Sequence, residues 1–225
     1  MLYYDDSYAT ECETVVTGVL EEDGRKYLIL RENLFYPQGG GEKGDRGTLE
    51  WEGGTARVLK ALRGPDGPVL ATDAEDPALL VGKTVHCSLD TAFRLHQMRL
   101  HSALHLLHSL IGDALGHDVE NPSLSEIEEG FAVNRYPAVE VDPVDFSEIE
   151  RRMNGIIARG APATVTPDPQ NPGFRVWRAI GHEIPCGGLH VRDLSEIGPV
   201  SLVLHRKKGN VSVKVFLESE SGSER

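Results

Sequence analysis

Two pairs of metal-binding side chains, each with a four-residue spacing, are the residues of this sequence best suited to chemistry. His101 and His105 lie in residues 99–108, where apolar residues recur at helical spacing. On a helix, residues four apart share one face, with Cβ atoms about 5–6 Å apart, so both imidazoles could bind one zinc ion. Cys186 and His190 repeat this spacing far downstream. Together the pairs supply the four nitrogen and sulfur ligands that zinc prefers, which predicts one shared metal site.

The chemistry of such a site stays open at this point. Three ligands and a zinc-bound water suit Lewis-acid catalysis, whereas four permanent ligands, including Cys186, suit a structural site. For the HxxxH pair alone, the alternative is a hydrogen-bonded structural pair on a half-buried helix. His108 lies one further turn along the same helix, and we interpret it as a structural hydrogen-bonding residue.

Net charge restricts the partners of the protein. The chain has a formal net charge of −12, which argues against broad, nonspecific binding of nucleic acid. Residues 118–150 carry one arginine against ten acidic residues, but residues 175–215 carry seven lysines and arginines against three acidic residues. The basic segment contains the Cys186–His190 pair, so a polyanion would approach there; the alternative is an ordinary solvated sheet edge. The residues predicted to contact a polyanion are Arg192, Arg206, Lys207 and Lys208.

Cysteine usage and apolar patterning indicate the cellular setting. The three cysteines Cys12, Cys87 and Cys186 are far apart, which is not typical of a disulfide framework. No apolar run approaches the length of a membrane span, and the N-terminal residues lack the features of a signal peptide. We therefore expect a reduced, cytoplasmic setting with no membrane partner.

The elements that must position these side chains divide the chain near residue 90. Residues 1–90 contain many short strand-like runs separated by turns, which predicts a small β-barrel domain. Residues 91–225 contain a long helix to about Leu115, a second helix over 146–159, several further strands and a polar tail from Ser219. The predicted fold class is α+β, with a barrel domain (1–90) and a domain of two helices packed on an antiparallel sheet (91–225).

A glycine-rich loop interrupts the strand pattern of the first 90 residues. Residues 35–47 contain five glycines, and no Gly-Lys-Ser/Thr ends the loop, so it is not a P-loop. Glycine lets backbone N–H groups approach a ligand or another segment closely. Asp45 and Arg46 within the loop indicate docking against another segment. The loop residues predicted to bind substrate are Gly39, Gly40, Gly41 and Glu42.

These motifs together resemble the AlaX family, freestanding proteins related to the editing domain of alanyl-tRNA synthetase. The resemblance rests on residues 35–47, residues 99–108 and residues 186–190, with Glu196-Ile197-Gly198 after them. Their order and spacing span nearly the whole chain and are similar to the medium-length type. The resemblance implies a β-barrel domain followed by an α+β editing domain. It also implies hydrolysis of the ester in mischarged alanine tRNA, chiefly with serine attached. The implied zinc ligands are His101, His105, Cys186 and His190.

Three positions depart from the pattern of the family. Leu189 stands where the family commonly has Thr, and Glu42 stands where it often has Gln. About twenty residues past His101 the family places a polar Thr or Gln that helps to discriminate the amino acid. The closest match is Glu120, with neighbours that could share its role. The candidate substrate-binding residues of this segment are Glu120, Asn121 and Ser123.

Three functions follow as alternatives from the sequence. The first is a trans-editing hydrolase that deacylates alanine tRNA mischarged with serine, with tRNA as partner and zinc as cofactor. The second is a zinc-dependent hydrolase of a small ester or amide, without tRNA. The third is a noncatalytic binding module that contains zinc. The sequence leaves the oligomeric state open between monomer and dimer.

Overall fold

The computed structural model describes residues 1–171 and 174–218. These described residues form two compact units, one from Met1 to His96 and one that begins at Gln97. The polar tail predicted from Ser219 lies outside the described residues. The boundary between the units falls within the first turns of helix α2 (Thr91–Leu115), a few residues past the predicted domain boundary. That boundary at residue 90 stays a proposal, because compactness alone does not show that either part folds independently.

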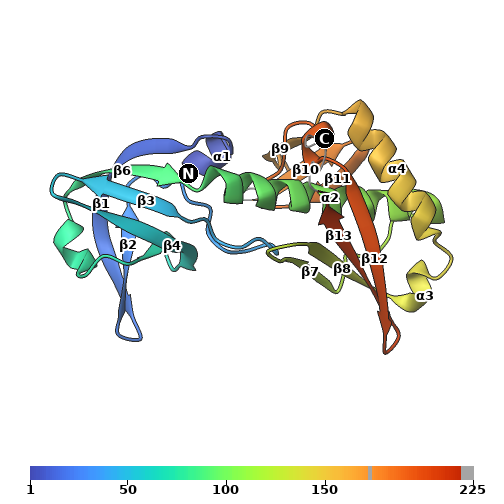
Figure 1. The fold of residues 1–225 in the computed structure, drawn as a ribbon, viewed down its shortest axis with the longest axis horizontal. Coiled ribbons are helices and arrows are strands. Elements are labelled where there is room, and N and C mark those ends of the chain that lie inside the picture. Colours follow the sequence, from blue (N-terminus) through green and yellow to red (C-terminus); the bar gives the residue numbers. More distant parts are fainter. Residues whose placement is uncertain (172–173, 219–225) are drawn as a thin grey trace, which may run out of the picture. The chain divides into compact units, whose positions relative to one another are not determined.

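The first unit is a closed six-stranded barrel with the strand order β1-β2-β5-β4-β3-β6. This confirms the barrel predicted from the short strand-like runs. Figure 1 labels most of its strands. The strands are β1 (Glu11–Glu22), β2 (Arg25–Leu30), β3 (Gly47–Trp51), β4 (Gly54–Gly64), β5 (Gly67–Thr72) and β6 (Thr84–Leu89). A short helix α1 (Leu2–Asp5) precedes the barrel, and a 3₁₀ turn η1 (Pro77–Leu80) precedes β6.

The barrel forms because alternate residues of its strands are apolar and point inward. Val16, Leu28, Leu49, Leu70 and Val85 come from five different strands, and each is completely buried in one core cluster. Strand β3 is only five residues long and continues directly from the glycine-rich loop, so its sequence carries little periodic signal.

The second unit has two antiparallel sheets and three further helical segments in its described part (Figure 1). One sheet has the order β11-β10-β9, and the other has the order β12-β13-β8-β7. The strands are β7 (Leu124–Ile127), β8 (Ala132–Pro137), β9 (Thr164–Pro167), β10 (Arg175–Ala179), β11 (His182–Pro185), β12 (Val200–Lys207) and β13 (Asn210–Leu217). The helical segments after α2 are α3 (Ala138–Val141), α4 (Phe146–Arg159) and the 3₁₀ turn η2 (Leu194–Ile197). The mixed α and β composition is as predicted.

Helix α2 begins and ends where its capping residues predict. The Asp90 carboxylate accepts the N–H of Phe93 at 3.0 Å, and Gly116 follows the last turn with φ of 73°. The sequence predicts a wide apolar stripe, but between Met98 and Ile111 the helix is buried on nearly every side. The reason is that both sheets of the second unit reach α2, through contacts at Leu104 and at the histidines described below. No helix among the residues described here is long and apolar enough to cross a membrane.

Candidate metal centre

Four nitrogen and sulfur donors from distant parts of the sequence converge in the second unit. His101 and His105 lie one turn apart on α2, and Cys186 and His190 lie in the loop after β11. Their ligand atoms are all within 4.8 Å of one another. Cys186 Sγ lies 3.5 Å from Nε2 of His101 and 3.4 Å from Nε2 of His190. The structure therefore brings the two predicted pairs to one point, where they could hold a metal ion.

Hydrogen bonds around these donors fix the loop to the helix. Ser102, which shares a turn of α2 with the ligand pair, has its Oγ 3.1 Å from Nδ1 of His190. The same Oγ accepts the N–H of Val191 at 3.1 Å. The N–H of Gly188 donates to Cys186 Sγ at 3.3 Å. Groups of this kind orient metal-binding side chains, because they hold the ring nitrogen or the sulfur in one direction.

The imidazoles of the centre are closely packed; His101 and His190 are buried and His105 is half-buried. The ring centroids of His101 and His190 are 4.2 Å apart, and Trp177 of β10 packs edge-on against His105 at 5.0 Å. Burial, and then the neighbouring imidazoles, lower the pKa of His105 and of His190 well below the ordinary value. Both rings are therefore neutral at neutral pH, which is the form that binds a metal ion.

The residues present fit a zinc ion. Three imidazoles and one cysteine sulfur are a nitrogen and sulfur donor set, which zinc accepts and magnesium or calcium does not favour. Nδ1 of His105 is also buried without a hydrogen-bond partner in the described structure. A buried polar atom left in this way is costly, and coordination by a metal ion is one arrangement that uses such a ring.

A pocket of about 440 Å³ is lined in part by residues that are close in sequence to two of the candidate metal ligands. His108, which lines it, follows His105 by one turn of α2, and Pro185, which also lines it, directly precedes Cys186. The volume lies in the range of pockets that bind small ligands. The other charged or titratable residues of its lining are Asp113, His117, Asp118, His182 and Glu183.

The residues predicted to select the amino acid lie in three different environments. Asn121 lines this pocket, whereas Glu120 is exposed in the segment between α2 and β7. Ser123 donates both its N–H and its hydroxyl to the carbonyl of Arg135, so its polar groups hold a strand in place. Leu189 is buried. The roles of Glu120 and Asn121 in substrate binding stay predictions.

The glycine-rich loop of the first unit contains a tight turn. Gly39 and Glu42 exchange both backbone hydrogen bonds at 3.1 Å. The two residues between them, Gly40 and Gly41, have φ of 63° and 88°, a backbone conformation that favours glycine. Glu42 is buried. Contact of these four residues with a substrate stays a prediction.

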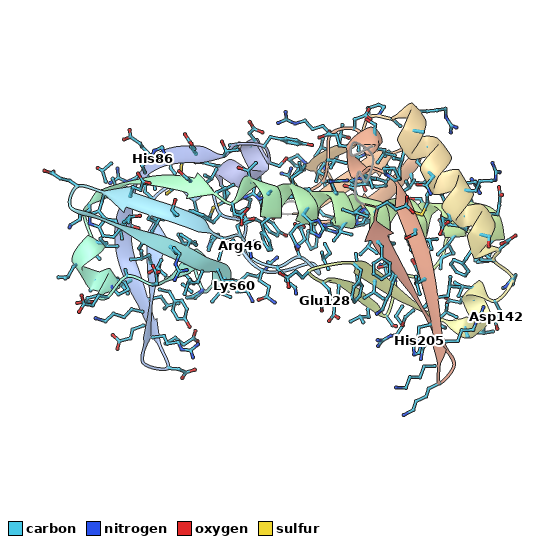
Figure 2. All side chains as sticks on the ribbon, viewed as in Figure 1. Arg46, Lys60, His86, Glu128, Asp142 and His205 are labelled. Carbon is cyan, nitrogen blue, oxygen red and sulfur yellow. The ribbon has the colours of Figure 1, made fainter. Side chains whose placement is uncertain are left out.

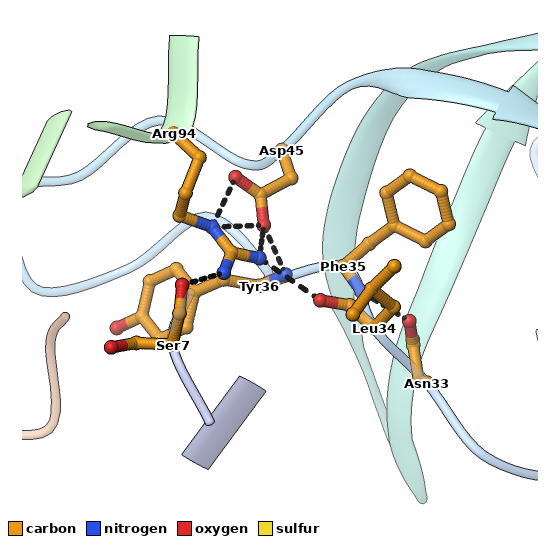
Figure 3. A network of polar contacts seen from close by, with 7 residues as sticks. All are labelled: Ser7, Asn33, Leu34, Phe35, Tyr36, Asp45 and Arg94. Atoms are coloured by element: carbon orange, nitrogen blue, oxygen red, sulfur yellow. Dashed lines mark hydrogen bonds and ion pairs between the residues drawn. The ribbon is translucent and has the colours of Figure 1, made fainter. Parts of the chain in front are cut away.

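The same loop is fixed within the first unit by a buried ion pair, shown in Figure 3. The Asp45 carboxylate accepts hydrogen bonds from Nε and Nη2 of Arg94 and from the backbone N–H of Tyr36. Arg94 also donates to the carbonyls of Ser7 and Leu34, each at 2.9 Å. The predicted docking of the loop is therefore against the first turn of α2, and its partner is Arg94.

Three of the four residues predicted to contact tRNA share one hairpin. Arg206, Lys207 and Lys208 are exposed at the turn between β12 and β13. Arg206 forms an ion pair with Asp142, which Figure 2 labels beside the hairpin. Arg192 is exposed in the segment before η2. An exposed cluster of cations on a hairpin turn is suited to a polyanion, but its contact with tRNA stays a prediction.

Sequence reasoning missed several polar residues near the centre. Ser102 and Trp177 contact the ligand histidines, and Asn134 and Tyr136 of β8 lie within a buried hydrogen-bonded chain that reaches His108. Ser102 could have been noticed as a serine within an apolar helical stripe. Asn134 and Tyr136 occupy alternate positions of a strand, which is the pattern of a core-facing pair with polar groups.

The fold and the site define a two-unit protein, with a β-barrel unit and an α/β unit that carries one candidate metal centre of nitrogen and sulfur donors. No family model matches the chain. The chain is 26% identical to the alanyl-tRNA editing protein AlaX-M of Pyrococcus horikoshii, across 96% of this chain and 97% of that protein. The predicted resemblance to the AlaX family, in its medium-length type, is therefore confirmed.

Alanine–tRNA ligases are similar to the chain as well. The chain is 29% identical to the ligase of Caldivirga maquilingensis across 90% of its length, and 29% identical to that of Thermofilum pendens across 97%. It spans only about a quarter of the length of these ligases, 24% and 26% respectively. The similarity to AlaX-M, in contrast, extends across almost the whole of both proteins.

Proposed function

We propose that this protein is a trans-editing hydrolase that removes serine from alanine tRNA, with zinc held by His101, His105, Cys186 and His190. One observation carries the proposal. The four donors converge in a chain that is similar over nearly its whole length to an alanyl-tRNA editing protein. Charged tRNA as the substrate also implies that the protein acts in the cytoplasm.

The reaction is an ester hydrolysis. A water oxygen attacks the carbonyl carbon, the bond from that carbon to the ribose oxygen breaks, and the ribose oxygen takes up a proton. Zinc held by three of these ligands would leave a position for water. It would then supply Lewis-acid stabilisation of the developing negative charge and would lower the pKa of that water molecule. Ser102 keeps His190 in the orientation that the ligand set needs. Asp118 lines the adjacent pocket and favours the α-ammonium group of an aminoacyl ester, whereas Glu183, which also lines it, pairs with Arg178.

A deacylation assay tests this function directly. Purified protein is incubated with alanine tRNA carrying serine, with alanine tRNA carrying alanine, and with serine tRNA carrying serine. We expect the first to be hydrolysed much faster than the other two. Hydrolysis of small esters with no effect on any charged tRNA would favour the small-ester hydrolase. Stoichiometric zinc with no hydrolysis of either kind would favour the noncatalytic module.

The basic hairpin should contribute to tRNA affinity. We expect Arg206→Glu with Lys207→Glu to weaken binding and to reduce the salt dependence of binding by about one counterion for each lost phosphate contact. Binding measured over a series of salt concentrations gives both quantities. Arg25→Glu with Lys26→Glu, at the β1–β2 turn, is the control with equal charge change. If both double variants weaken binding equally, the effect reflects net charge and no hairpin site exists.

Glu120 is the predicted residue for serine selectivity. A carboxylate that accepts the serine hydroxyl would lose a charge-assisted bond in Glu120→Ala, so release of serine should slow by roughly ten- to a hundredfold and release of alanine by far less. If Glu120 holds the α-ammonium group, both reactions should slow equally. Asn121→Ala is the comparison, because Asn121 lines the pocket. Unchanged rates for Glu120→Ala would show that this exposed acid has no part in selection.

A further inference from the structure

A chain of hydrogen bonds, buried at Asn134 and Tyr136, leads from β7 to the pocket beside the metal centre. The hydroxyl of Ser125 donates to Oδ1 of Asn134. Nδ2 of Asn134 donates to the hydroxyl of Tyr136 at 3.1 Å, and that hydroxyl lies 3.1 Å from Nδ1 of His108. Asn134 and Tyr136 are almost completely buried, whereas His108 lines the pocket. The chain therefore ends at an imidazole that faces a possible ligand.

The positions of the hydrogens in this chain follow from its acceptors. Nδ2 of Asn134 also donates to the carbonyl of Leu104 at 3.3 Å, and a carbonyl only accepts, so the orientation of the amide is determined. The Tyr136 hydroxyl accepts from this amide and has its own hydrogen left to donate. Its one remaining partner in the described structure is Nδ1 of His108. Nδ1 must then be the unprotonated nitrogen of the ring.

The opposite tautomer of His108 would leave a buried hydrogen-bond donor without an acceptor. If Nδ1 of His108 carried the hydrogen, the hydroxyl of Tyr136 would accept twice and its own hydrogen would have no acceptor among the described residues. A buried donor without a partner costs free energy, so this arrangement is disfavoured. Burial also raises the pKa of Tyr136, so the phenol keeps its hydrogen at neutral pH. The planes of the two rings are within 5° of parallel.

We propose that His108 presents its Nε2–H to the pocket as a fixed hydrogen-bond donor, and that it binds an uncharged oxygen of the acyl-adenosine end of the substrate. Tyr136 is the positioning residue that holds this tautomer. This inference rests on the proposed function and assigns His108 a binding role, in place of the purely structural hydrogen bond that the sequence favours. Nε2 has no protein partner in residues 1–171 and 174–218, so it is available to a ligand.

The surroundings of His108 determine which kind of oxygen it would bind. Asp113, Asp118 and Glu183 line the same pocket, where Asp113 pairs with Arg152 and Glu183 pairs with Arg178. The lining residues include no lysine or arginine, and the Asp118 carboxylate makes the pocket unfavourable for a phosphate group. Burial, and then the neighbouring His182, lower the pKa of His108, so the ring is a neutral donor. A neutral N–H among carboxylates suits a ribose hydroxyl or the ester carbonyl oxygen, since these accept a hydrogen bond without adding a full charge.

The tautomer can be measured without any substrate. Nitrogen-15 NMR correlations of the imidazole rings in purified wild-type protein should show His108 with hydrogen on Nε2 and none on Nδ1. The His108→Asn spectrum identifies the signal. Tyr136→Phe should give a mixture of tautomers, whereas Tyr27→Phe in β2 should leave the signal unchanged. Hydrogen on Nδ1 in the wild-type protein would overturn the proposal.

Two substitutions of His108 test the binding role. The amide nitrogen of Asn takes the place of Nδ1, whereas that of Gln takes the place of Nε2. We expect His108→Asn to lower kcat/KM for seryl-tRNA deacylation by roughly ten- to a hundredfold, and His108→Gln to lower it several-fold less, with unchanged zinc content in both. If kcat/KM falls equally in the two variants, or does not fall in the Asn variant while the wild-type protein is active, the binding role of His108 is rejected. The proposed function is not affected by that result. A wild-type protein without deacylase activity rejects the proposed function, and the substrate assignment of His108 with it.

Discussion

Replacing His105 with alanine should remove both the bound zinc and the hydrolytic activity. The substitution deletes one of four donors that lie within 4.8 Å of one another, and it leaves a cavity next to Trp177 and His190. Loss of one ligand from a four-ligand nitrogen and sulfur site weakens zinc binding strongly, because three donors close the site incompletely. We expect less than a stoichiometric amount of zinc in the purified variant and no deacylation above background.

Metal analysis and the deacylation assay, made on the same preparations, check this result. His86→Ala is the matched control, because it removes a histidine from the barrel strand β6 and leaves all four donors in place. The control should keep wild-type zinc and activity. Full zinc occupancy in the His105 variant would show that the site is wrong as described. Full activity with zinc absent would show that the metal has no part in the reaction.

Removal of the metal should also reduce stability, which gives a readout besides activity. A ligand that binds only the folded protein stabilises it by about 2.7 kcal/mol at a free concentration of 100 times its Kd. A chelator should therefore lower the unfolding temperature of the wild-type protein and leave that of the His105→Ala variant unchanged. Equal responses of the two proteins would indicate that the chelator acts elsewhere.

The bounds of the two main helices could be predicted from the sequence, because capping residues and apolar periodicity mark where each helix begins and ends. Helix α2 ends at Leu115 before Gly116, and α4 covers Phe146–Arg159 before Gly160. These signals are local, since they depend on residues within one or two turns. The turn between β1 and β2 is local in the same way, because Asp23 and Gly24 are adjacent residues that take the positive φ it requires.

Features that depend on contacts between residues far apart in the sequence were harder to predict from the sequence. The spacing of His101 and His105 predicts a shared helical face, but the direction in which the Cys186 loop approaches depends on its bonds to Ser102 and on β11. Strand β11 has four residues, so it gives little periodic signal. The hydrogens that orient His108 follow from Tyr136, which is 28 residues away. Such arrangements result from packing and from satisfied buried polar groups.

Replacing Arg94 with alanine should destabilise the barrel unit by about 3–5 kcal/mol. Arg94 and Asp45 are both almost completely buried, and Arg94 also satisfies the carbonyls of Ser7 and Leu34 (Figure 3). Removing one partner of a buried ion pair leaves an uncompensated charge, and this is the source of the large cost. Arg57→Ala is the control, because its pair with Asp73 is exposed and should cost about 0–1 kcal/mol.

Denaturant unfolding can be followed with a single fluorescent reporter that lies in the barrel unit. The chain has two tryptophans, so Trp177→Phe leaves Trp51 of β3 as the fluorescent reporter of the first unit. Arg94→Ala and Arg57→Ala are compared in that background. Asp45→Ala with Arg94→Ala should be less destabilised than the sum of the two single variants, because the double variant buries no lone charge. Strict additivity would show that the two side chains do not act as a pair.

The loss of unfolding free energy caused by Arg94→Ala should also depend on pH, and it should become smaller as the pH is lowered. Burial raises the pKa of Asp45, and the Arg94 guanidinium opposes this rise. Without Arg94, the folded variant binds a proton on Asp45 at a higher pH than the unfolded chain does, so lowering the pH favours the folded state. The difference in unfolding free energy from the wild-type background should therefore shrink as the pH is lowered from neutral towards the ordinary pKa of an aspartate. A deficit that is constant or grows on acidification would show that the cost comes from lost packing and unsatisfied carbonyls, and not from a charge left buried on Asp45.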